Sequence, residues 1–212
     1  MIAPPVTQAG EEIGARGAEL AAAGRALYAR GMVPATSGNF SARLANGDIL
    51  ITVSGAHKGR LEPDQLMLID ATGNSLDGRR SSAETALHVQ LYRRFPDCHA
   101  VLHPHSPAAT LLSRLDPGPC VLQGYELLKA LPGIDTHDTT VTIPNFANDQ
   151  DIARLALLVD DWMDRHDPVP AYLIGGHGFY TWGASVDAAM RHVEALDFLF
   201  ECELRLLGVK RP

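Results

Sequence analysis

The sequence has few cysteines, no long apolar run and no excess of positive charge, and each shortage argues against a class of protein. Cys98, Cys120 and Cys202 are scattered and form no CxxC pair, so we expect reduced thiols rather than a disulfide framework. The longest apolar runs fall far short of the about 20 residues that a membrane-spanning helix needs. The 18 lysines and arginines are outnumbered by 25 acidic residues, giving a formal net charge of -7. This balance argues against the basic face that nucleic-acid binding requires.

The N-terminal segment MIAPPVTQAGEEIG lacks the apolar region of a signal peptide and carries acidic residues early. The 212 residues are 46% hydrophobic and 20% charged, which is typical of a globular protein with a substantial core. No repeat, low-complexity tract or linker divides them. We therefore expect one domain over residues 1–212 that is cytoplasmic, with no membrane or nucleic-acid partner.

Helical and extended patterns alternate, and several predicted strands follow one another through tight turns. Asn46-Gly47 predicts a hairpin, Ser81 and Glu84 form a capping-box pattern, and Ser106 before Pro107 is typical of a helix start. The pattern predicts an α/β fold with three αβα layers, in which helices flank a central mixed, largely antiparallel sheet. The predicted helices cover residues 8–31, 81–94, 125–131, 148–165 and 185–207, with another from residue 106, and the predicted strands cover residues 39–44, 48–53, 66–69, 99–103, 140–143, 171–174 and 178–182.

His103-Pro104-His105 is the sharpest local signal for a metal site. In an extended segment, residues i and i+2 point to the same face, with Cα atoms roughly 6.5–7 Å apart. Two such imidazoles can converge on one ion. Pro104 cannot donate a ladder hydrogen bond, so the pair belongs at a strand end. The alternative is two ordinary surface or capping histidines.

His177 is the candidate for a third ligand. It directly follows a predicted apolar strand and has glycines on both sides, which free the backbone to turn sharply. The alternative is a polar residue in a turn. Three imidazoles leave an open coordination position, as in catalytic rather than structural zinc sites, although they also suit cobalt, manganese or iron.

Three segments carry small hydrogen-bond donors suited to an anion. Residues 36–39 (TSGN) and Ser54-Gly55 lie at either end of the predicted hairpin, and Ser81-Ser82 begins a predicted helix. The free N–H groups and the dipole of a helix N-terminus favour an anion. Lys58 could add charge. Taken singly, each segment is more often a turn or a cap.

Four motifs in one order cover nearly the whole chain: TSGNFS, SGAHKG, SSAETALHVQLYRRFPDCHAVLHPHS and GGHGFYTWG. Together they resemble the class II (zinc) aldolase superfamily, which includes fuculose-phosphate aldolase, ribulose-phosphate 4-epimerase and the adducin head domain. The resemblance implies one Zn²⁺ per subunit on His103, His105 and His177, a small sugar-phosphate substrate, and a homotetramer with sites near subunit interfaces. The phosphate-binding residues that it implies are Thr36, Gly38, Asn39, Ser54, Gly55, Ser81 and Ser82.

Three further segments, QGYELLKALPGIDTH, IPNFANDQDI and HVEALDFLFECEL, resemble the methylthioribulose-1-phosphate dehydratases of methionine salvage. In these dehydratases the glutamate matching Glu126 is the general acid/base, whereas aldolases have their catalytic carboxylate at the position of Glu84. The resemblance favours Glu126 as the base and leaves Glu84 to position the substrate or tune the zinc. The structural alternatives are a capping box for Glu84 and a solvated first-turn acid for Glu126.

The expected activity is therefore that of a hydro-lyase that converts 5-methylthioribulose 1-phosphate to 2,3-diketo-5-methylthiopentyl 1-phosphate. An aldolase or 4-epimerase acting on another sugar phosphate is the first alternative, because it would use the same enediolate. A non-catalytic interaction module like the adducin head domain is the second. The presence of all three histidines and both glutamates argues against that second alternative.

Overall fold

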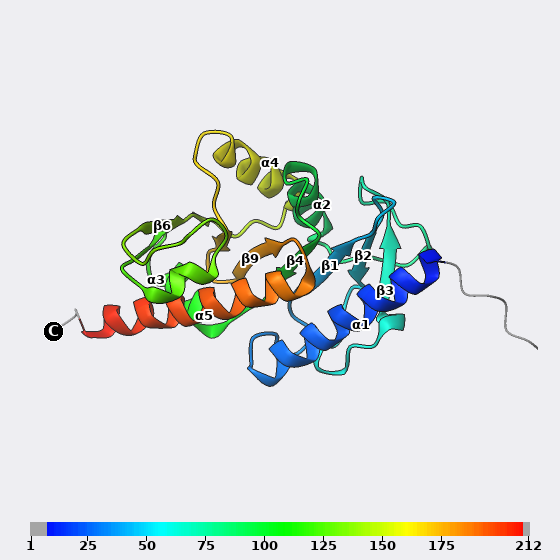
Figure 1. Cartoon of the computed structure of the whole chain (residues 1–212), viewed down its shortest axis with the longest axis horizontal. Helices are drawn as coiled ribbons and strands as arrows, with labels where there is room; N and C mark the ends of the chain where they lie inside the picture. The colour runs from blue at the N-terminus through cyan, green and yellow to red at the C-terminus, as the bar shows by residue number, and fades with distance from the viewer. Residues whose placement is uncertain (1–7, 210–212) are drawn as a thin grey trace, which may run out of the picture.

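A seven-stranded sheet runs through the middle of the molecule (Figure 1). The computed structural model describes residues 8–209. Both ends of the predicted domain lie outside the described residues, including the first seven residues of the N-terminal segment that we expect to lack a signal peptide. The strands of this sheet are β1 (Asn39–Arg43), β2 (Ile49–Thr52), β3 (Leu66–Ile69), β4 (Ala100–His103), β7 (Asn145–Phe146), β8 (Ala171–Ile174) and β9 (Gly178–Gly183).

The strand order is β3-β2-β1-β4-β9-β8-β7. Strands β7 and β8 pair in parallel, and every other neighbouring pair in this sheet is antiparallel. The expected mixed, largely antiparallel sheet is confirmed. Its strands β1, β4 and β9, on which the candidate site depends, lie side by side at its centre.

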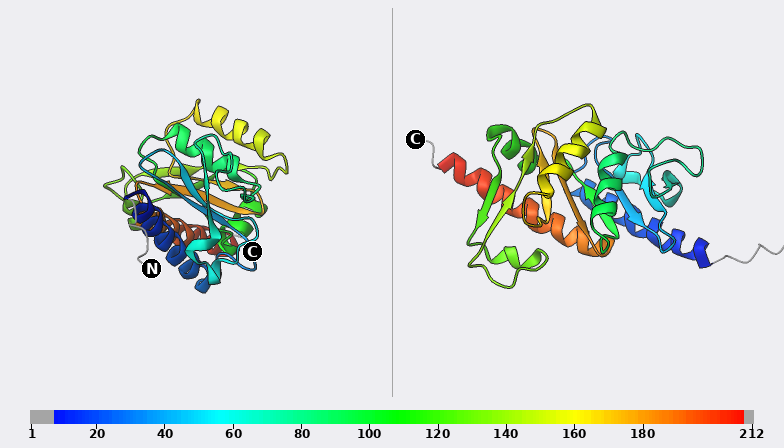
Figure 2. Two further views of the ribbon diagram at one scale, coloured as in Figure 1. Left: turned by 90° about the vertical axis from the view of Figure 1, so that its right-hand side faces the viewer. Right: turned by 90° about the horizontal axis from the view of Figure 1, so that it is seen from above.

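Helices cover both faces of this sheet, as the two further views in Figure 2 show. One face carries α1, α3 and α5, and the other carries α2 and α4, which completes the expected three layers. No described helix is both long enough and apolar enough to span a bilayer. The helices are α1 (Gln8–Ala29), α2 (Thr85–Arg94), α3 (Pro107–Leu115), α4 (Ile152–Met163) and α5 (Val186–Val209), with 3₁₀ helices η1 (Lys58–Arg60), η2 (Pro63–Gln65) and η3 (Glu126–Ala130).

Side chains alternate between the two layers because successive strand residues point to opposite faces. Leu102 of β4 and Phe179 of β9 belong to the core under α1, α3 and α5. Val101 and Tyr180, their neighbours in sequence, belong to the core under α2 and α4. Strands β4 and β9 are therefore buried on both faces, which explains their largely apolar character.

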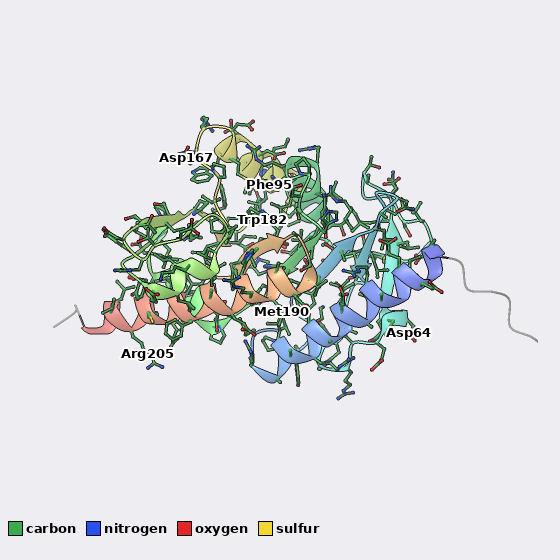
Figure 3. The ribbon with its side chains drawn as sticks, in the orientation of Figure 1. Asp64, Phe95, Asp167, Trp182, Met190 and Arg205 are labelled. Carbon is green, nitrogen blue, oxygen red and sulfur yellow. The ribbon has the colours of Figure 1, made fainter. Side chains whose placement is uncertain are left out.

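Figure 3 shows side chains filling the space on both sides of the sheet. On the side of α2 and α4, Phe95 and Trp182 stack with ring centroids 5.0 Å apart. Met190 of α5 packs against the opposite core. Each face thus has its own packed cluster, and the sheet is clamped between them.

The sequence pattern missed two strands, β7 and β5 (Cys120–Gln123). β7 has only two residues, too few to show an alternating pattern. β5 pairs with β6 (Thr140–Ile143) in a separate two-stranded sheet, where every second residue is exposed. The exposed Val121 is as apolar as its buried neighbours, so the sequence of β5 does not show this alternation.

Two predicted helix starts were wrong. Helix α4 begins at Ile152, where Asp151 accepts a hydrogen bond from the amide of Arg154 at 3.0 Å, rather than after Asn148. Helix α2 begins at Thr85, so Glu84 is its N-cap residue and makes no side-chain cap hydrogen bond. The capping box does not form, because the Glu84 carboxylate contacts other elements of the fold.

Gly178 allows the start of β9 to lie against the end of β4. A Cβ atom there would overlap the carbonyl oxygen of Pro104 and lie 3.1 Å from Cα of His105. Both are backbone atoms, which cannot swing aside as a flexible side chain can. The amide of Phe179 donates to the same Pro104 carbonyl at 3.2 Å, so the contact is part of the strand pairing.

We predict that Gly178→Ala lowers the free energy of unfolding by about 1–3 kcal/mol, the usual cost of overpacking. Gly14→Ala is the control, since nothing lies within 4 Å of a Cβ at this exposed position in α1. It should raise stability by about 1 kcal/mol through helix propensity. Urea denaturation measures both, and a Gly178→Ala protein as stable as the parent would contradict the packing argument.

Candidate metal centre

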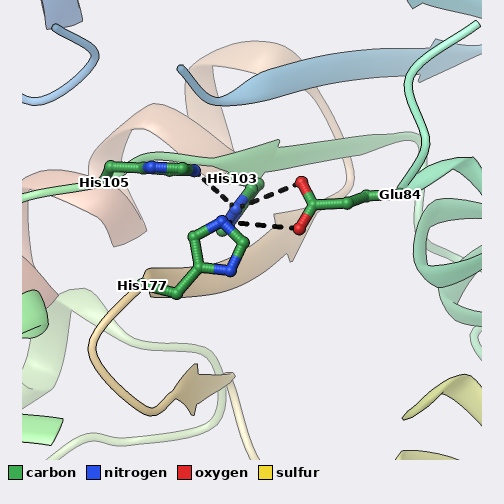
Figure 4. Close-up of side chains that lie close together, drawn as sticks. All are labelled: Glu84, His103, His105 and His177. Atoms are coloured by element: carbon green, nitrogen blue, oxygen red, sulfur yellow. Dashed lines mark hydrogen bonds and ion pairs between the residues drawn. The ribbon is translucent and has the colours of Figure 1, made fainter. Parts of the chain in front are cut away.

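Four side chains from separate parts of the sequence converge beside the sheet (Figure 4). His103 ends β4 and His105 follows two residues later. His177 lies in the tight turn between β8 and β9, and Glu84 immediately precedes α2. Because β4 and β9 are antiparallel neighbours in the sheet, the HPH segment at the end of β4 lies beside the GGHG turn at the start of β9. The predicted convergence of the three histidines is therefore seen in the structure.

The distances within this cluster suit a tetrahedral metal ion. Nε2 of His103 lies 2.9 Å from Nε2 of His105 and 3.4 Å from Oε2 of Glu84. Nε2 of His177 lies 3.5 Å from Oε1 of Glu84. Ligand atoms about 2.0–2.1 Å from a tetrahedral zinc ion are roughly 3.3–3.4 Å from one another. Two of the three measured separations are thus close to this spacing, and all four ligand atoms lie within 4.8 Å of one another.

The histidines have the protonation state that ligands need. Nδ1 of His103 donates to the carbonyl oxygen of Phe179 at 2.8 Å, so its Nε2 carries a lone pair that faces the cluster. Burial, reinforced by His177, holds the pKa of His103 well below its usual value. Burial and the neighbouring histidines lower the pKa of His105 to about 3. These two imidazoles are neutral at pH 7, as metal ligands must be.

Glu84 supports the fit of a cation. It is 8% exposed, and its Oε1 accepts no hydrogen bond from any described residue. A buried carboxylate oxygen without a donor is costly. A divalent cation among the three imidazoles would compensate that oxygen directly. The residues therefore fit a metal ion, with Glu84 as a fourth ligand or as a group that contacts a bound water.

Asn39 holds the other oxygen of Glu84. Its Nδ2 donates to Oε2 of Glu84 at 2.6 Å and to Oγ of Ser82 at 3.3 Å. The Asn39 side chain is therefore engaged by other residues of the protein and supports the Glu84 carboxylate. The predicted role of Asn39 in phosphate binding stays a prediction.

A cavity of about 340 Å³ opens beside the cluster and is lined by Glu84, His105 and His177. Six of the seven predicted phosphate-binding residues also line it, whereas Ser81 does not and instead forms an isolated bridge with Val53. The six are Thr36, Gly38, Asn39, Ser54, Gly55 and Ser82.

Gly38 joins the first of these loops to the metal cluster. It has a φ of 74°, and a Cβ there would come within 2.7 Å of the His103 carbonyl oxygen. Only glycine combines this left-handed conformation with so close an approach. The TSGN loop is thus pressed against the strand that carries the first histidine.

Lys58 is the strongest source of positive charge in the cavity. It is 2% exposed, and its Nζ donates to the carbonyl oxygens of Thr36 and Ala56, each at 2.9 Å. Burial lowers the pKa of Lys58 to about 8, although the nearby Glu84 raises it in part. Lys58 is therefore largely charged at pH 7 and ties together the two loops predicted to hold a phosphate.

The cavity is also lined by Asn148, Asp149 and Gln150, which sequence reasoning assigned to a helix. Asp149 accepts from Arg154 at 2.6 Å, which fixes this loop to the first turn of α4. The cluster of polar residues in the segment NDQ was the only signal for a loop. It was ambiguous because Asn is also a common helix cap.

Glu126 lies outside this cluster in the single chain. Its side chain is 72% exposed, contacts Lys129 and lies 3.5 Å from Nδ1 of His137. The hydrogen bond from Lys129 lowers its pKa. Glu126 lines a separate depression against α5 that includes Phe198. Its catalytic role stays a prediction.

Comparison with known proteins agrees with this architecture. The family of class II aldolase and adducin N-terminal domains matches residues 18–204. The chain is 64% identical over 200 residues to a methylthioribulose-1-phosphate dehydratase from Methylococcus capsulatus, covering 94% of this chain and 98% of the relative. A protein of the same name from Pseudomonas paraeruginosa is 56% identical over 191 residues, covering 89% and 93%.

A solved structure also resembles this chain over nearly its whole length. YgbL from Klebsiella pneumoniae, described as a putative aldolase/epimerase/decarboxylase, matches with a TM-score of 0.79 and 25% identity. The match covers 94% of this chain and 92% of YgbL. Sequence, fold and the histidine cluster agree, and the chain belongs to the class II aldolase and adducin N-terminal domain family.

Proposed function

We propose that this protein is a zinc-dependent hydro-lyase that dehydrates 5-methylthioribulose 1-phosphate to 2,3-diketo-5-methylthiopentyl 1-phosphate in methionine salvage. The observation that carries the proposal is the cluster of three histidines and Glu84 beside a cavity lined by Lys58 and small donors. The choice of substrate is supported by the 64% identity to a methylthioribulose-1-phosphate dehydratase.

His103, His105 and His177 would hold the zinc ion, and their imidazoles suit it better than a hard cation such as Mg²⁺. When bound, zinc supplies Lewis acidity that stabilises negative charge at the C2 oxygen and acidifies the C3 proton. The chain's own part is to keep the ligands neutral and correctly oriented. The bond from His103 to the Phe179 carbonyl does this for the first ligand.

The loops around Gly38, Ser54 and Gly55, together with Ser82, form the proposed site for the C1 phosphate, with Lys58 behind them. Hydroxyls and a buried ammonium group suit an anion. Contacts to the phosphate fix the end of the substrate remote from the reacting carbons. That binding energy is converted into orientation at C3 and C4.

In the proposed reaction, a carboxylate takes the proton from C3. The hydroxyl at C4 then leaves as water, taking up a proton, and the resulting enol ketonises to the diketone. We assign the proton transfer to Glu126. Glu126 lies on another face of its own chain, so we infer that it acts at the metal centre of a neighbouring copy. Glu84 then orients the substrate and tunes the metal.

Assembly into a homotetramer and residence in the cytoplasm belong to the same proposal. The first is supported by the family resemblance and by the position of Glu126, beside the exposed Phe198 on α5. The second is supported by the free cysteines Cys98, Cys120 and Cys202, none of which is paired.

Aldol cleavage is the second candidate, because Glu84 contacts the histidines at the position where aldolases of this family carry their catalytic carboxylate. Both reactions begin beside a polarised carbonyl. Product analysis separates them, since a diketone without free aldehyde indicates dehydration. The adducin-like alternative is disfavoured, because a non-catalytic module has no use for three imidazoles and a carboxylate that converge beside a cavity.

We predict that a chelator, or His103→Ala, reduces turnover of 5-methylthioribulose 1-phosphate to background, because all three histidines are needed to hold the ion. Diketone formation and bound zinc, measured on the same samples, should fall together and return with added Zn²⁺ after chelation. His166→Ala, at an exposed histidine beyond α4, is the matched control and should keep both. Full activity in metal-free protein would overturn the zinc assignment.

We predict that Glu126→Gln lowers kcat by roughly 10²–10⁴-fold while zinc stays bound, since a general base contributes about that much. Glu84→Gln should mainly weaken zinc binding. Co-expression of Glu126→Gln with His103→Ala chains should restore part of the activity, because mixed assemblies combine an intact base with an intact metal centre. An inactive Glu84→Gln beside an active Glu126→Gln would reverse the assignment.

We predict that Lys58→Met raises the KM for the sugar phosphate about tenfold, as expected for one charged hydrogen bond. In the parent, inhibition by inorganic phosphate should weaken as pH rises from 7 to 9, because a Lys58 with a pKa of about 8 loses its positive charge over this range. Lys58→Met should lack that weakening. Arg60→Met, which removes an exposed positive charge two residues away, should keep the parental KM.

A further inference from the structure

Behind Glu84, a row of buried polar side chains joins helix α2 to strand β1. Glu84, His88 and Tyr92 are spaced four residues apart and lie on one face of the helix. Asn39 and Ser41 are two residues apart on β1 and face the same layer. Asn39, Ser41, His88 and Tyr92 are each 4% exposed or less. Buried polar groups of this kind must satisfy one another.

These five side chains form one continuous hydrogen-bonded chain. Tyr92 OH lies 2.8 Å from Oγ of Ser41, which lies 2.7 Å from Nδ1 of His88. Nε2 of His88 contacts Oδ1 of Asn39, and Nδ2 of Asn39 donates to Oε2 of Glu84 at 2.6 Å. The chain therefore ends at the carboxylate that faces the three histidines.

The direction of every hydrogen bond follows from the charge at that end. An ionised carboxylate only accepts, so Asn39 presents its NH₂ group to Glu84 and its carbonyl oxygen to His88. Nε2 of His88 must then carry the hydrogen. Burial lowers the pKa of His88 to about 4, so the ring is neutral and its Nδ1 accepts from Ser41. Ser41 in turn accepts from Tyr92.

The reverse arrangement is disfavoured at two contacts. Rotating the Asn39 amide would bring its carbonyl oxygen against Oε2 of Glu84, leaving two buried acceptors at hydrogen-bond distance. Moving the His88 hydrogen to Nδ1 would leave a bare Nε2 against the Asn39 carbonyl oxygen. Each fault would leave a buried polar group without its partner. The His88 tautomer and the Asn39 orientation are therefore coupled.

We propose that His88 is a positioning residue, whose Nε2–H tautomer locks the Asn39 amide so that it holds the Glu84 carboxylate toward the three histidines. His88 itself contacts neither substrate nor metal in this role. The inference rests on the proposed function only in that the cluster must bind a metal ion. The tautomer itself is a property of the folded chain.

The first test reads this tautomer directly in the otherwise unaltered protein. A long-range ¹H–¹⁵N spectrum of ¹⁵N-histidine-labelled protein distinguishes the two neutral tautomers, and His88→Gln identifies the His88 signals by their loss. The expected result is a neutral ring protonated at Nε2. A ring protonated at Nδ1, or on both nitrogens at pH 7, would overturn the proposal. This test needs no substrate and no metal.

The second test measures zinc affinity by competition with a chromophoric chelator. His88→Phe keeps an aromatic ring but has no N–H, and we expect it to weaken zinc binding by about 10–100-fold, as losses of groups that orient ligands do. His88→Gln can donate to Asn39 and accept from Ser41, so it should recover part of that loss. If Gln is as weak as Phe, the hydrogen bond is not what positions Glu84, and the proposal fails.

The matched control is His192→Phe. His192 is also buried and donates from Nδ1 to the carbonyl oxygen of Trp182 at 2.7 Å, but it belongs to α5 and does not contact the cluster. The zinc affinity of the His192→Phe variant should stay within about threefold of that of the parent, in line with the modest indirect effects of remote substitutions. Equal losses in the His88 and His192 variants would reduce His88 to a structural role. Absence of zinc binding in the parent would refute the proposed function, while the tautomer measurement would still stand.

Discussion

The close pairing of β4 with β9 is the constraint on which the candidate site depends. His103 ends one strand and His177 precedes the other, and the bare Cα of Gly178 lets the two segments meet at the Pro104 carbonyl. The Phe179 carbonyl of β9 receives the Nδ1 hydrogen of His103. The sheet therefore sets the spacing of the ligands and also decides which imidazole nitrogen faces them. A wider separation of β4 and β9 would remove both the spacing of the ligands and the hydrogen bond that orients His103.

Two opposite charges are buried in the same cavity, and each is compensated by its own loop. Asn39 donates to Glu84, while the carbonyl oxygens of Thr36 and Ala56 accept from Lys58. A metal ion near Glu84 and a phosphate near Lys58 would each neutralise the nearer charge. Because buried charges interact strongly, we expect the binding of one to favour the binding of the other.

Under the proposed function, the choice between dehydration and aldol cleavage depends on which carboxylate meets the reacting carbon. Dehydration and aldol cleavage both begin beside a carbonyl polarised by the metal, so the histidines and the phosphate loops suit either reaction. Glu84 reaches the histidines from within the same chain, and its orientation depends on Asn39 and His88. Glu126 lies on another face, and the inference that it acts in a second copy makes assembly part of the active site.

The sequence by itself determined features that depend on neighbours in the chain. Asn46-Gly47 forms the predicted turn, Ser106 caps its helix, and His103-Pro104-His105 ends a strand with both rings on one face. Only the tertiary structure decided which groups from other elements each side chain meets. Glu84 bonds to β1 instead of closing a capping box, and Lys58 is buried between two loops. These outcomes depend on contacts between residues more than 20 positions apart, which leave no periodic signal in the sequence.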